Sequence, residues 1–480
     1  MKQIIQNLNN GSIELEEVPI PKIKSGHILI QTTYSLISAG TEKMLLNFGK
    51  SGYIGKAMQQ PEKLKEVINK AKNEGLFNTW ETVQNKLSQP IPLGYSNIGV
   101  VVEVSDDVKD FKIGQRVVSN GNHSEIVLVP KNLCVHLPDN VSDIDASFTI
   151  LGSIGLQGTR LANPTLGETI VVSGLGIIGL LTAQILLAQG CKVIGIDIDQ
   201  KKCDLANDLG IDAINLNTSE DPISSIMGKT NYRGVDGVII TAATSSNDPI
   251  DLAAKICRQR GRIILVGVTG LELNRDLFYK KELTFQVSCS YGPGRYDPKY
   301  EIEGIDYPLG LVRWTEKRNM ETIVDLISSK KIIVDKLITH KFNLYKFQNA
   351  YDLLESKEFF LGILLKYPNK INSQKTILIS KNNIINLENK KSTKIEPIVN
   401  FLGSGNYASN ILIPLFYKER VNLFTISANN GLSPTRLAKK FKFKKATTDS
   451  EECFRDKTAN TIVICTRHDS HFEYIIRALE

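Results

Sequence analysis

The sequence predicts an α/β protein in which a β-rich N-terminal domain precedes one doubly wound domain and then a second, incomplete one. Three observations lead to this prediction. Short strand-like apolar segments occur within residues 1–38 and again from Pro92 to Pro130. A buried strand, a glycine-rich turn and an apolar helix follow one another from Thr169, and the same succession returns at Ile398. Buried strands that alternate with helices form parallel sheets covered on both faces, so each of these two regions is predicted to be one such sheet.

Composition places the chain among ordinary globular proteins. Its 480 residues exceed what one hydrophobic core holds, so two or three domains are expected. The net charge of +7 is spread over lysines along the chain, which does not indicate nucleic-acid binding. The seven cysteines form no C-x-x-C pair, which favours a reducing cytoplasm over disulfides or a structural zinc loop. The N-terminus lacks the apolar core of a signal peptide.

The glycine-rich turn after the strand Ile170–Val172 predicts a dinucleotide-binding site. Gly174 permits the tight turn, Gly176 lets a pyrophosphate approach the backbone, and Gly179 lets the following helix pack on the strand. A transmembrane helix is the competing interpretation of this nearly uncharged stretch. The five glycines between Thr169 and Asp197 argue against it, because they break the run into strand, turn and helix.

The next strand predicts the choice of nucleotide. It ends at Asp197, which follows Gly174 by 23 positions, near the spacing of about 20 expected for the acid that binds the ribose. A carboxylate accepts hydrogen bonds from a 2′-hydroxyl and repels a 2′-phosphate, so NAD is favoured over NADP. Lys202 either approaches the same ribose or is a solvated helix lysine. Ile178 and the strand ends at Thr241 and Val266 are predicted to line the crevice.

The order of segments in the first 366 residues resembles the medium-chain dehydrogenase/reductase family, with its GroES-like barrel and Rossmann domain. The segments that carry the resemblance come in the family's order: Ser38–Glu42, Leu93–Val101, Phe111–Val117, Glu125–Pro130, and then the dinucleotide fold. The resemblance implies a barrel domain at 1–150, completed by about 300–366, and an NAD-binding domain at 151–299. A polar helical pattern lies at 43–87. The resemblance also implies a homo-oligomer, a small-molecule substrate and no insertion into a membrane.

The chain departs from the zinc-dependent members of that family at the metal site. By alignment, Ser38 replaces a cysteine, Tyr95-Ser96 replaces a His-Glu pair, and Leu151 replaces a second cysteine. Zinc needs thiolate, imidazole or carboxylate ligands, so no metal site is predicted.

Without zinc, another group must act on the substrate oxygen. Tyr95 and Ser38 are predicted to donate a hydrogen bond or relay the proton there; the alternative is that they only fill the vacated space. His123 is a further candidate, for substrate binding, although a lone loop histidine is often structural.

The stretch after Ser288 is rich in glycine, aromatic residues and arginine. Its start aligns near the nicotinamide, so Tyr291 is a third candidate catalytic residue. Arg295 and Tyr296 are predicted to bind a polar, sugar-like or anionic substrate. The alternative is an ordinary structured loop with surface arginines.

The C-terminal part begins with a polar stretch, 367–396, predicted to be a linker with at most one short strand. Gly403 and Gly405 then begin a second G-x-G-x-x-A fingerprint, predicted to bind a nucleotide. Residues 397–480 resemble the N-terminal half of the glucose-fructose/inositol dehydrogenase-like (Gfo/Idh/MocA) nucleotide domain, and the resemblance implies a truncated module, because that family's substrate sheet and catalytic lysine come later. No acid ends the second strand of this module, where Ser427 stands, so its cofactor preference stays open.

The two-module order resembles bacterial bi-domain oxidoreductases of surface-polysaccharide and sugar metabolism. The sequence therefore predicts a zinc-independent, NAD(H)-dependent oxidoreductase that interconverts an alcohol and a carbonyl on a sugar-like or polyol substrate. Two alternatives remain: an NAD(P)H-dependent quinone or enoyl reductase of the same fold, and a non-catalytic nucleotide-binding protein.

Overall fold

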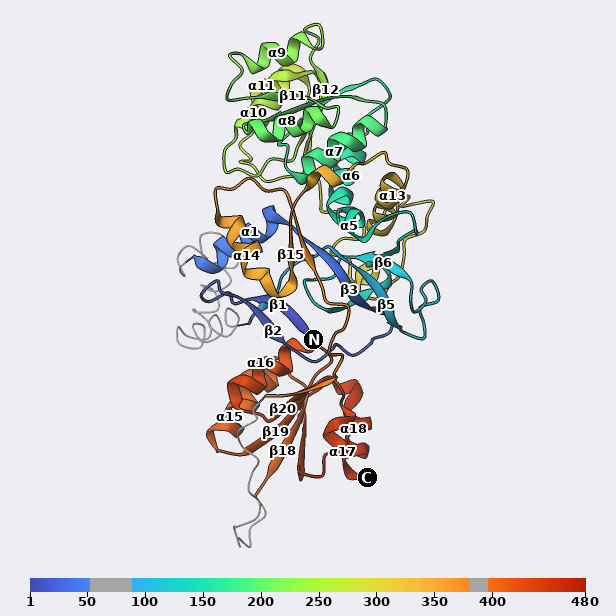
Figure 1. Cartoon of the computed structure of the whole chain (residues 1–480), viewed down its shortest axis with the longest axis vertical. Coiled ribbons are helices and arrows are strands. Elements are labelled where there is room, and N and C mark those ends of the chain that lie inside the picture. The colour runs from blue at the N-terminus through green and yellow to red at the C-terminus, as the bar shows by residue number, and fades with distance from the viewer. Residues whose placement is uncertain (52–88, 380–395) are drawn as a thin grey trace.

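The computed structural model describes residues 1–51, 89–379 and 396–480. Three modules lie in a row along the long axis of the molecule, and the N-terminal β-rich module is the middle one (Figure 1). The first doubly wound module lies at one end and the C-terminal module at the other. Both predicted nucleotide folds therefore adjoin the same β-rich module.

The β-rich module consists of two sheets of mainly antiparallel strands. The larger has the order β15-β16-β3-β5-β6-β8, with β7 also beside β3, and the smaller has the order β2-β1-β4. The long strand β3 pairs with β5, β7 and β16, so it is the centre of the larger sheet. The N-terminal strands are β1 (Lys2–Gln6), β2 (Ile13–Glu17), β3 (His27–Ile37), β4 (Ile91–Pro92), β5 (Asn97–Val104), β6 (Arg116–Ser119), β7 (Ile126–Pro130) and β8 (Cys134–His136).

The chain returns to this module after the first doubly wound sheet, as the resemblance implied. β15 (Ile338–Asn343) pairs with β16 (Gly362–Lys366), and β16 pairs antiparallel with β3. Helix α14 (Phe347–Glu355) lies between these strands in sequence, and α1 (Ala39–Lys50) packs against it. The predicted helical pattern at 43–87 is confirmed for α1, and the rest of it lies outside the described residues.

The first doubly wound module is a six-stranded sheet in which every pairing is parallel. Its strands are β9 (Thr169–Ser173), β10 (Lys192–Asp197), β11 (Asp212–Asn215), β12 (Val235–Ile240), β13 (Cys257–Leu265) and β14 (Thr284–Val287). Their spatial order is β11-β10-β9-β12-β13-β14. Numbered from β9, this is the order 3-2-1-4-5-6 of dinucleotide-binding folds, with the switch point between β9 and β12.

Helices cover this sheet and join it to the β-rich module. α6 packs on α7 and on α13, so the segment after the β-rich module and the segment after the sheet meet. The helices are α5 (Asp143–Ala146), α6 (Thr149–Ala162), α7 (Ile177–Ala188), α8 (Gln200–Asp208), α9 (Pro222–Gly228), α10 (Asp248–Ile256), α11 (Arg275–Lys281), α12 (Pro298–Glu301) and α13 (Glu316–Ser328).

The C-terminal module repeats the beginning of the same topology. Its sheet has the order β17-β20-β19-β18-β21, and β18 to β21 pair in parallel. Counted from β18, the parallel strands follow the order 3-2-1-4. The strands are β17 (Thr376–Leu378), β18 (Ile398–Leu402), β19 (Asn422–Ser427), β20 (Lys445–Thr447) and β21 (Thr461–Ile464). The sequence indicated β18 and β19, whereas β20 is too short to have a recognisable pattern.

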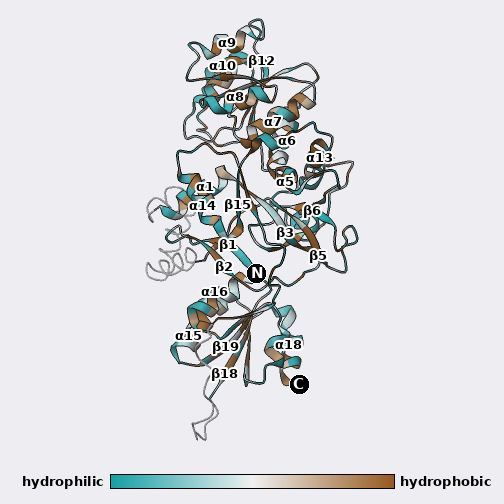
Figure 2. Ribbon diagram, in the orientation of Figure 1, coloured by the Kyte–Doolittle hydropathy of each residue, from teal (hydrophilic) through white to brown (hydrophobic). Residues whose placement is uncertain are grey.

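The helices of this module follow its strands in turn, and the hydrophobic residues of β18 and β19 lie between them (Figure 2). They are the π-helical turn Ala408–Leu412 with α15 (Ile413–Lys418), α16 (Leu432–Phe441), α17 (Glu451–Arg455) and α18 (His471–Leu479). The strand β17 lies inside the predicted linker 367–396 and pairs antiparallel with β20. That part of the linker is therefore an ordered edge of the module, and residues 380–395 lie outside the described residues.

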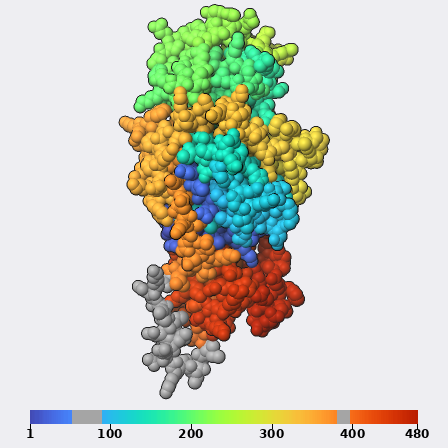
Figure 3. Space-filling view, turned by 45° about the vertical axis from the view of Figure 1, so that its right-hand side comes forward, coloured from blue at the N-terminus to red at the C-terminus, as the bar shows by residue number. Residues whose placement is uncertain are grey.

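The C-terminal module is docked on the β-rich module, as the contact between red, blue and orange surfaces in Figure 3 shows. Backbone hydrogen bonds join Lys22 N to the Asn429 oxygen at 3.0 Å and Ile20 N to the Gln374 oxygen at 3.1 Å. A Cβ atom at Gly431 would meet the Pro19 oxygen at 2.0 Å, so the two backbones touch there. The contact therefore fixes the loop after β19 against the β-rich module.

The stretch that also fitted a membrane span forms β9, α7 and β10 instead. Within the ranges 1–51, 89–379 and 396–480, no helix has the length and apolar character needed to cross a bilayer.

Candidate active site

The glycine turn between β9 and α7 has the shape that a pyrophosphate requires. Gly174 has φ +97°, and a Cβ there would meet the Ala242 nitrogen at 2.7 Å. A Cβ at Gly179 would lie 1.9 Å from the Gly174 oxygen, which only glycine avoids. A Cβ at Gly176 would meet nothing within 4 Å, so the surface above it is open to a ligand. These three positions fit the predicted phosphate site.

Asp197 lies at the end of β10 with its carboxylate against the same turn. Its Oδ2 accepts from Leu175 N at 2.6 Å, and its Oδ1 accepts from Asp199 N at 2.9 Å. The ammonium of Lys202 is 3.9 Å from Oδ2. A carboxylate accepts about four hydrogen bonds, so capacity remains for ribose hydroxyls. The structure thus places Lys202 beside Asp197, which is the position expected if this lysine approaches the ribose.

The remaining predicted crevice residues lie around this turn. Thr241 Oγ1 donates to the Gly174 oxygen at 2.6 Å and ties β12 to the turn. Ile178 and Val266 are partly buried and pack against the largest hydrophobic cluster of the molecule, which includes Leu151 and Tyr291. Gly158 on α6 lies so close to Val266 that a Cβ there would meet its Cγ2 at 2.4 Å. One contiguous core therefore joins the crevice to α6.

Ser38 and Tyr95 meet in the structure, as the alignment predicted. The two side-chain oxygens are 2.6 Å apart, and Thr41 Oγ1 lies 3.3 Å from the Tyr95 hydroxyl. Burial raises the pKa of Tyr95, so its phenol keeps its proton at neutral pH and can donate it. Tyr95 also packs against the cluster that contains Leu151. The corner is thus formed by hydroxyl groups, with the Tyr95 ring against this hydrophobic cluster.

A buried polar network lies directly behind this corner and centres on Glu42. Its Oε1 accepts from Ser38 N at 2.9 Å and is 3.2 Å from His123 Nε2, and its Oε2 accepts from the Tyr351 hydroxyl at 2.6 Å. On the other side of the imidazole, Ser35 Oγ lies 2.7 Å from Nδ1. Both Glu42 and His123 are almost without exposed surface. Tyr351 lies on α14, in the segment that follows the nucleotide fold. Through its hydrogen bond to Glu42, this segment thus stabilises the part of the corner that contains Ser38.

The structure corrects the predicted role of His123. Its side chain is 0% exposed, both ring nitrogens have partners, and Gly94 lies against its ring face, where a Cβ would be 2.6 Å away. It is not placed to touch a substrate, and it positions Gly94, the residue before Tyr95. The sequence analysis did not predict a role for Glu42. The indication available was its position at the end of the Ser38–Glu42 segment, which carried the family resemblance.

The metal ligands that the fold family implies do not fit this corner. Ser38, Tyr95 and Leu151 offer neither thiolate, imidazole nor carboxylate, and zinc takes these ligands in proteins. In the described parts of the chain, no three His, Cys, Asp or Glu side chains group as metal ligands.

The aromatic loop after β14 packs its start into the protein and leaves its tip outside. Tyr291 is 3% exposed, and its hydroxyl accepts from Asn120 Nδ2 at 3.4 Å, across to the end of β6. Tyr296 is 72% exposed. Arg295 forms an ion pair with Glu301 and lies 4.4 Å from the centre of the Tyr296 ring. Tyr291 and Arg295 are therefore partly engaged within the protein, and Tyr296 is accessible.

Glu316 at the start of α13 is the unexpected feature beneath this loop. It is 0% exposed, and neither carboxylate oxygen has a hydrogen-bond partner among the described residues. Desolvation, and then the negative charge of Glu301, raise the pKa of Glu316 to about 8, against the opposing effect of Arg295.

This carboxyl makes the stability of the protein depend on pH. The folded chain binds the proton of Glu316 more tightly than the unfolded chain does, so the contribution of this carboxyl to stability is fully present below about pH 4.5 and is lost as pH rises through about 8. Glu316→Gln should flatten the dependence of the urea midpoint on pH across this window and raise the midpoint at pH 9. Glu303→Gln, on an exposed side chain of the same loop, is the matched control. An unchanged pH profile in Glu316→Gln would show that this group does not titrate in the folded protein.

Comparison with known proteins agrees with the fold. Residues 70–139 match the alcohol dehydrogenase GroES-like domain, and residues 178–302 match the zinc-binding dehydrogenase domain. L-idonate 5-dehydrogenase of Vitis vinifera is 24% identical over 300 residues, which cover 55% of this chain and 76% of the relative. Sorbitol dehydrogenase of Halalkalibacterium halodurans is 24% identical over 311 residues, which cover 57% of this chain and 82% of the relative.

Solved structures share the same two-domain fold. A protein described as a short-chain alcohol dehydrogenase, from Escherichia coli CFT073 and in complex with NADH, aligns with TM-score 0.58 and 20% identity over 76% of this chain and 99% of its own. A protein described as a zinc-binding dehydrogenase, from Sinorhizobium meliloti 1021 and bound to NADP, aligns with TM-score 0.57 and 19% identity over 76% of this chain and 99% of its own. The protein is an enzyme, a dehydrogenase of the medium-chain dehydrogenase/reductase type.

Proposed function

We propose that the protein is a zinc-independent, NAD(H)-dependent oxidoreductase that interconverts an alcohol and a carbonyl on a sugar-like or polyol substrate. The observation that carries the proposal is the hydroxyl pair of Ser38 and Tyr95, whose oxygens are 2.6 Å apart. By alignment, this pair lies where the zinc-dependent members of the medium-chain dehydrogenase/reductase family hold their metal. The relatives named for L-idonate and sorbitol support the substrate class.

The chain's own residues have three tasks in this mechanism. The Gly174–Gly179 turn binds a pyrophosphate, and Asp197 accepts hydrogen bonds from the ribose. The nicotinamide supplies or accepts the hydride when bound. The Tyr95 hydroxyl donates a hydrogen bond to the substrate oxygen and, for reduction, gives its proton to that oxygen. Ser38 Oγ, 2.6 Å away, hydrogen-bonds to the phenol and orients it, and solvent replaces the proton that the phenol gives up.

Zinc independence rests on the chemistry of the corner. Two hydroxyl groups and Leu151 cannot supply the ligands of a catalytic zinc. Protein purified without a metal-affinity step should contain no stoichiometric zinc by elemental analysis, and dialysis against a chelator should leave turnover unchanged. Stoichiometric zinc that resists dialysis would contradict the proposal.

A preference for NAD rests on Asp197. Asp197→Asn keeps an oxygen that accepts the Leu175 N–H but removes the charge that repels a 2′-phosphate. NADH affinity should fall about tenfold, the effect of one charge-assisted hydrogen bond, and the gap to NADPH should narrow. Calorimetric titration measures both, with the exposed Asp204→Asn on α8 as control. Unchanged NADH affinity in Asp197→Asn would place the ribose elsewhere.

The substrate side of the site is proposed to include the aromatic loop. Tyr296 is exposed, and Arg295 lies over its ring, so the loop offers a cation and an aromatic face to a polar substrate. The resemblance to bi-domain oxidoreductases supports a role in surface-polysaccharide metabolism.

Turnover distinguishes this function from its alternatives. The full chain should oxidise sugar-like or polyol alcohols with NAD, or reduce their carbonyls with NADH. Reduction of a quinone or an α,β-unsaturated thioester in preference to every carbonyl would favour the reductase. Nucleotide binding without any turnover would favour a non-catalytic protein.

For the C-terminal module we propose nucleotide binding at Gly403 and Gly405, as the resemblance to the Gfo/Idh/MocA nucleotide domain implies. Gly403 has φ +107°, and a Cβ there would meet the Cys465 oxygen at 2.5 Å, while a Cβ at Gly405 would meet nothing within 4 Å. These properties match those of Gly174 and Gly176 in the first module.

A further inference from the structure

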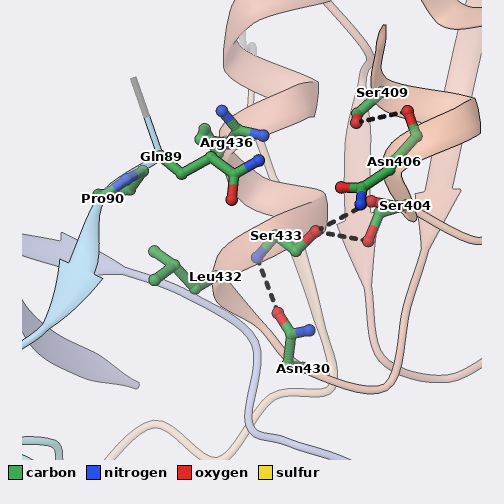
Figure 4. A pocket seen from close by; sticks show the side chains of 9 residues that line it. All are labelled: Gln89, Pro90, Ser404, Asn406, Ser409, Asn430, Leu432, Ser433 and Arg436. Atoms are coloured by element: carbon green, nitrogen blue, oxygen red, sulfur yellow. Dashed lines mark hydrogen bonds between the residues drawn. The ribbon is translucent and has the colours of Figure 1, made fainter. Parts of the chain in front are cut away.

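A polar hollow of about 200 Å³ lies at the carboxyl edge of the C-terminal sheet. Ser404 and Asn406 line it from the glycine turn after β18, and Ser433 and Arg436 line it from α16. Figure 4 shows Arg436 beside Gln89, with the turn residues on the opposite side. The hollow thus lies between the glycine turn and the loop after β19. In a dinucleotide fold this is where the adenosine ribose lies.

Arg436 is the one charged side chain of this lining, and in the described parts of the chain it has neither a hydrogen bond nor an ion pair. Burial lowers the pKa of Arg436, and no neighbouring charge opposes that effect. The partly buried Lys445 of the same module differs, because it pairs with Glu452 and Asp456. A partly desolvated cation without a counter-ion is unfavourable, and an anionic ligand would compensate for it.

The end of β19 differs from the end of β10 in charge. β10 ends in Asp197, whose carboxylate lies against its glycine turn, whereas β19 ends in Ser427 and is followed by Ala428, Asn429 and Asn430. The hollow therefore has a guanidinium and no carboxylate where the first module has a carboxylate. An acid at this place favours a free 2′-hydroxyl, and an arginine accommodates a 2′-phosphate.

The glycine turn leaves room for such a ligand. Gly403 N donates to the Ser427 oxygen at 2.8 Å, as Gly174 N donates to the Ile196 oxygen at 2.8 Å. Ser404 and Ser433 are linked by their hydroxyls at 2.5 Å, so the turn and α16 are held together at the rim of the hollow.

We infer that the C-terminal module is a second dinucleotide site that selects a 2′-phosphorylated ribose, with Arg436 as the counter-charge of the phosphate. The inference rests on the proposal that this module binds a nucleotide. It gives the two modules of one chain opposite selectivity, with NAD(H) at Asp197 and NADP(H) at Arg436. Ser433 and Asn406 supply the neutral hydrogen bonds around the phosphate.

The test uses the full chain with its first site blocked. Gly176→Asp places a carboxylate where a pyrophosphate would bind, and it folds without strain because a Cβ there meets nothing within 4 Å. This variant should bind NADPH at least about tenfold more tightly than NADH, measured by nucleotide fluorescence. Adding Arg436→Leu should lower NADPH affinity by about tenfold or more and leave NADH affinity nearly unchanged. Adding Gly405→Asp should abolish binding of both.

Controls separate the site from general charge and from free phosphate. Arg420→Leu removes an exposed cation of the same module between α15 and β19, at the opposite edge of the sheet, and should change neither affinity. Inorganic phosphate should displace NADPH far less effectively than 2′-AMP; equal displacement would overturn the inference. Equal affinities for NADH and NADPH in Gly176→Asp, or no effect of Arg436→Leu, would also overturn it while nucleotide binding stands. If Gly176→Asp binds neither nucleotide, both the inference and the proposed second nucleotide site are wrong.

Discussion

Tyr95→Phe should lower kcat about 100-fold, the effect of losing a general acid or base, and leave KM nearly unchanged. The substitution keeps the ring in the hydrophobic cluster and removes only the hydroxyl that lies 2.6 Å from Ser38 Oγ. Since one partly buried hydrogen bond is lost, the free energy of unfolding should fall by only about 1 kcal/mol. Steady-state kinetics with the best substrate of the polyol panel is the measurement.

Tyr34→Phe is the matched control for Tyr95→Phe. Tyr34 packs against the same cluster, and its hydroxyl makes no hydrogen bond to another of the described residues. Its loss should leave kcat unchanged. A Tyr95→Phe enzyme that retains kcat within about twofold would show that Ser38 and Tyr95 only fill the place of a metal.

Glu42→Ala should reduce the free energy of unfolding more than the other substitutions proposed for the site do. The carboxylate is 1% exposed and accepts from Ser38 N and the Tyr351 hydroxyl while lying against His123. Its removal leaves three buried polar groups without their acceptor, which costs about 3 kcal/mol or more. The first thermal transition of the full chain should fall by roughly 6–12 °C, which scanning calorimetry measures.

The control for Glu42→Ala is Glu303→Ala, which removes an exposed carboxylate and should shift the transition by less than about 2 °C. Glu42→Gln should recover part of the loss, because its amide oxygen still accepts a hydrogen bond. If the first thermal transition of Glu42→Ala occurs at the wild-type temperature, the network around Glu42 does not stabilise the region of Ser38 and Tyr95. The kcat of the Glu42→Ala enzyme should also fall, since Ser38 N loses its hydrogen-bond acceptor.

Elements whose pattern is local could be predicted from the amino-acid sequence. The run Gly174, Gly176 and Gly179 marks both the turn and its ligand, because only glycine fits the backbone approach at Gly174 and Gly179. The apolar strands β9, β12 and β18 were evident for the same reason, since strands buried on both faces are continuous apolar runs. The pairing of Ser38 with Tyr95 followed from the family resemblance, which supplied the long-range alignment.

The roles that depend on distant partners became visible only in the folded protein. His123 looked available in the sequence, but Glu42 and Ser35 take its two nitrogens. Glu316 became a group with a pKa of about 8 because the loop above it removes water and supplies no donor. The unpaired Arg436 is likewise visible only in three dimensions. Burial and the presence of a partner are properties of the folded chain, whereas glycine conformation and apolar periodicity are properties of a short segment, which is why the sequence alone determined only the latter.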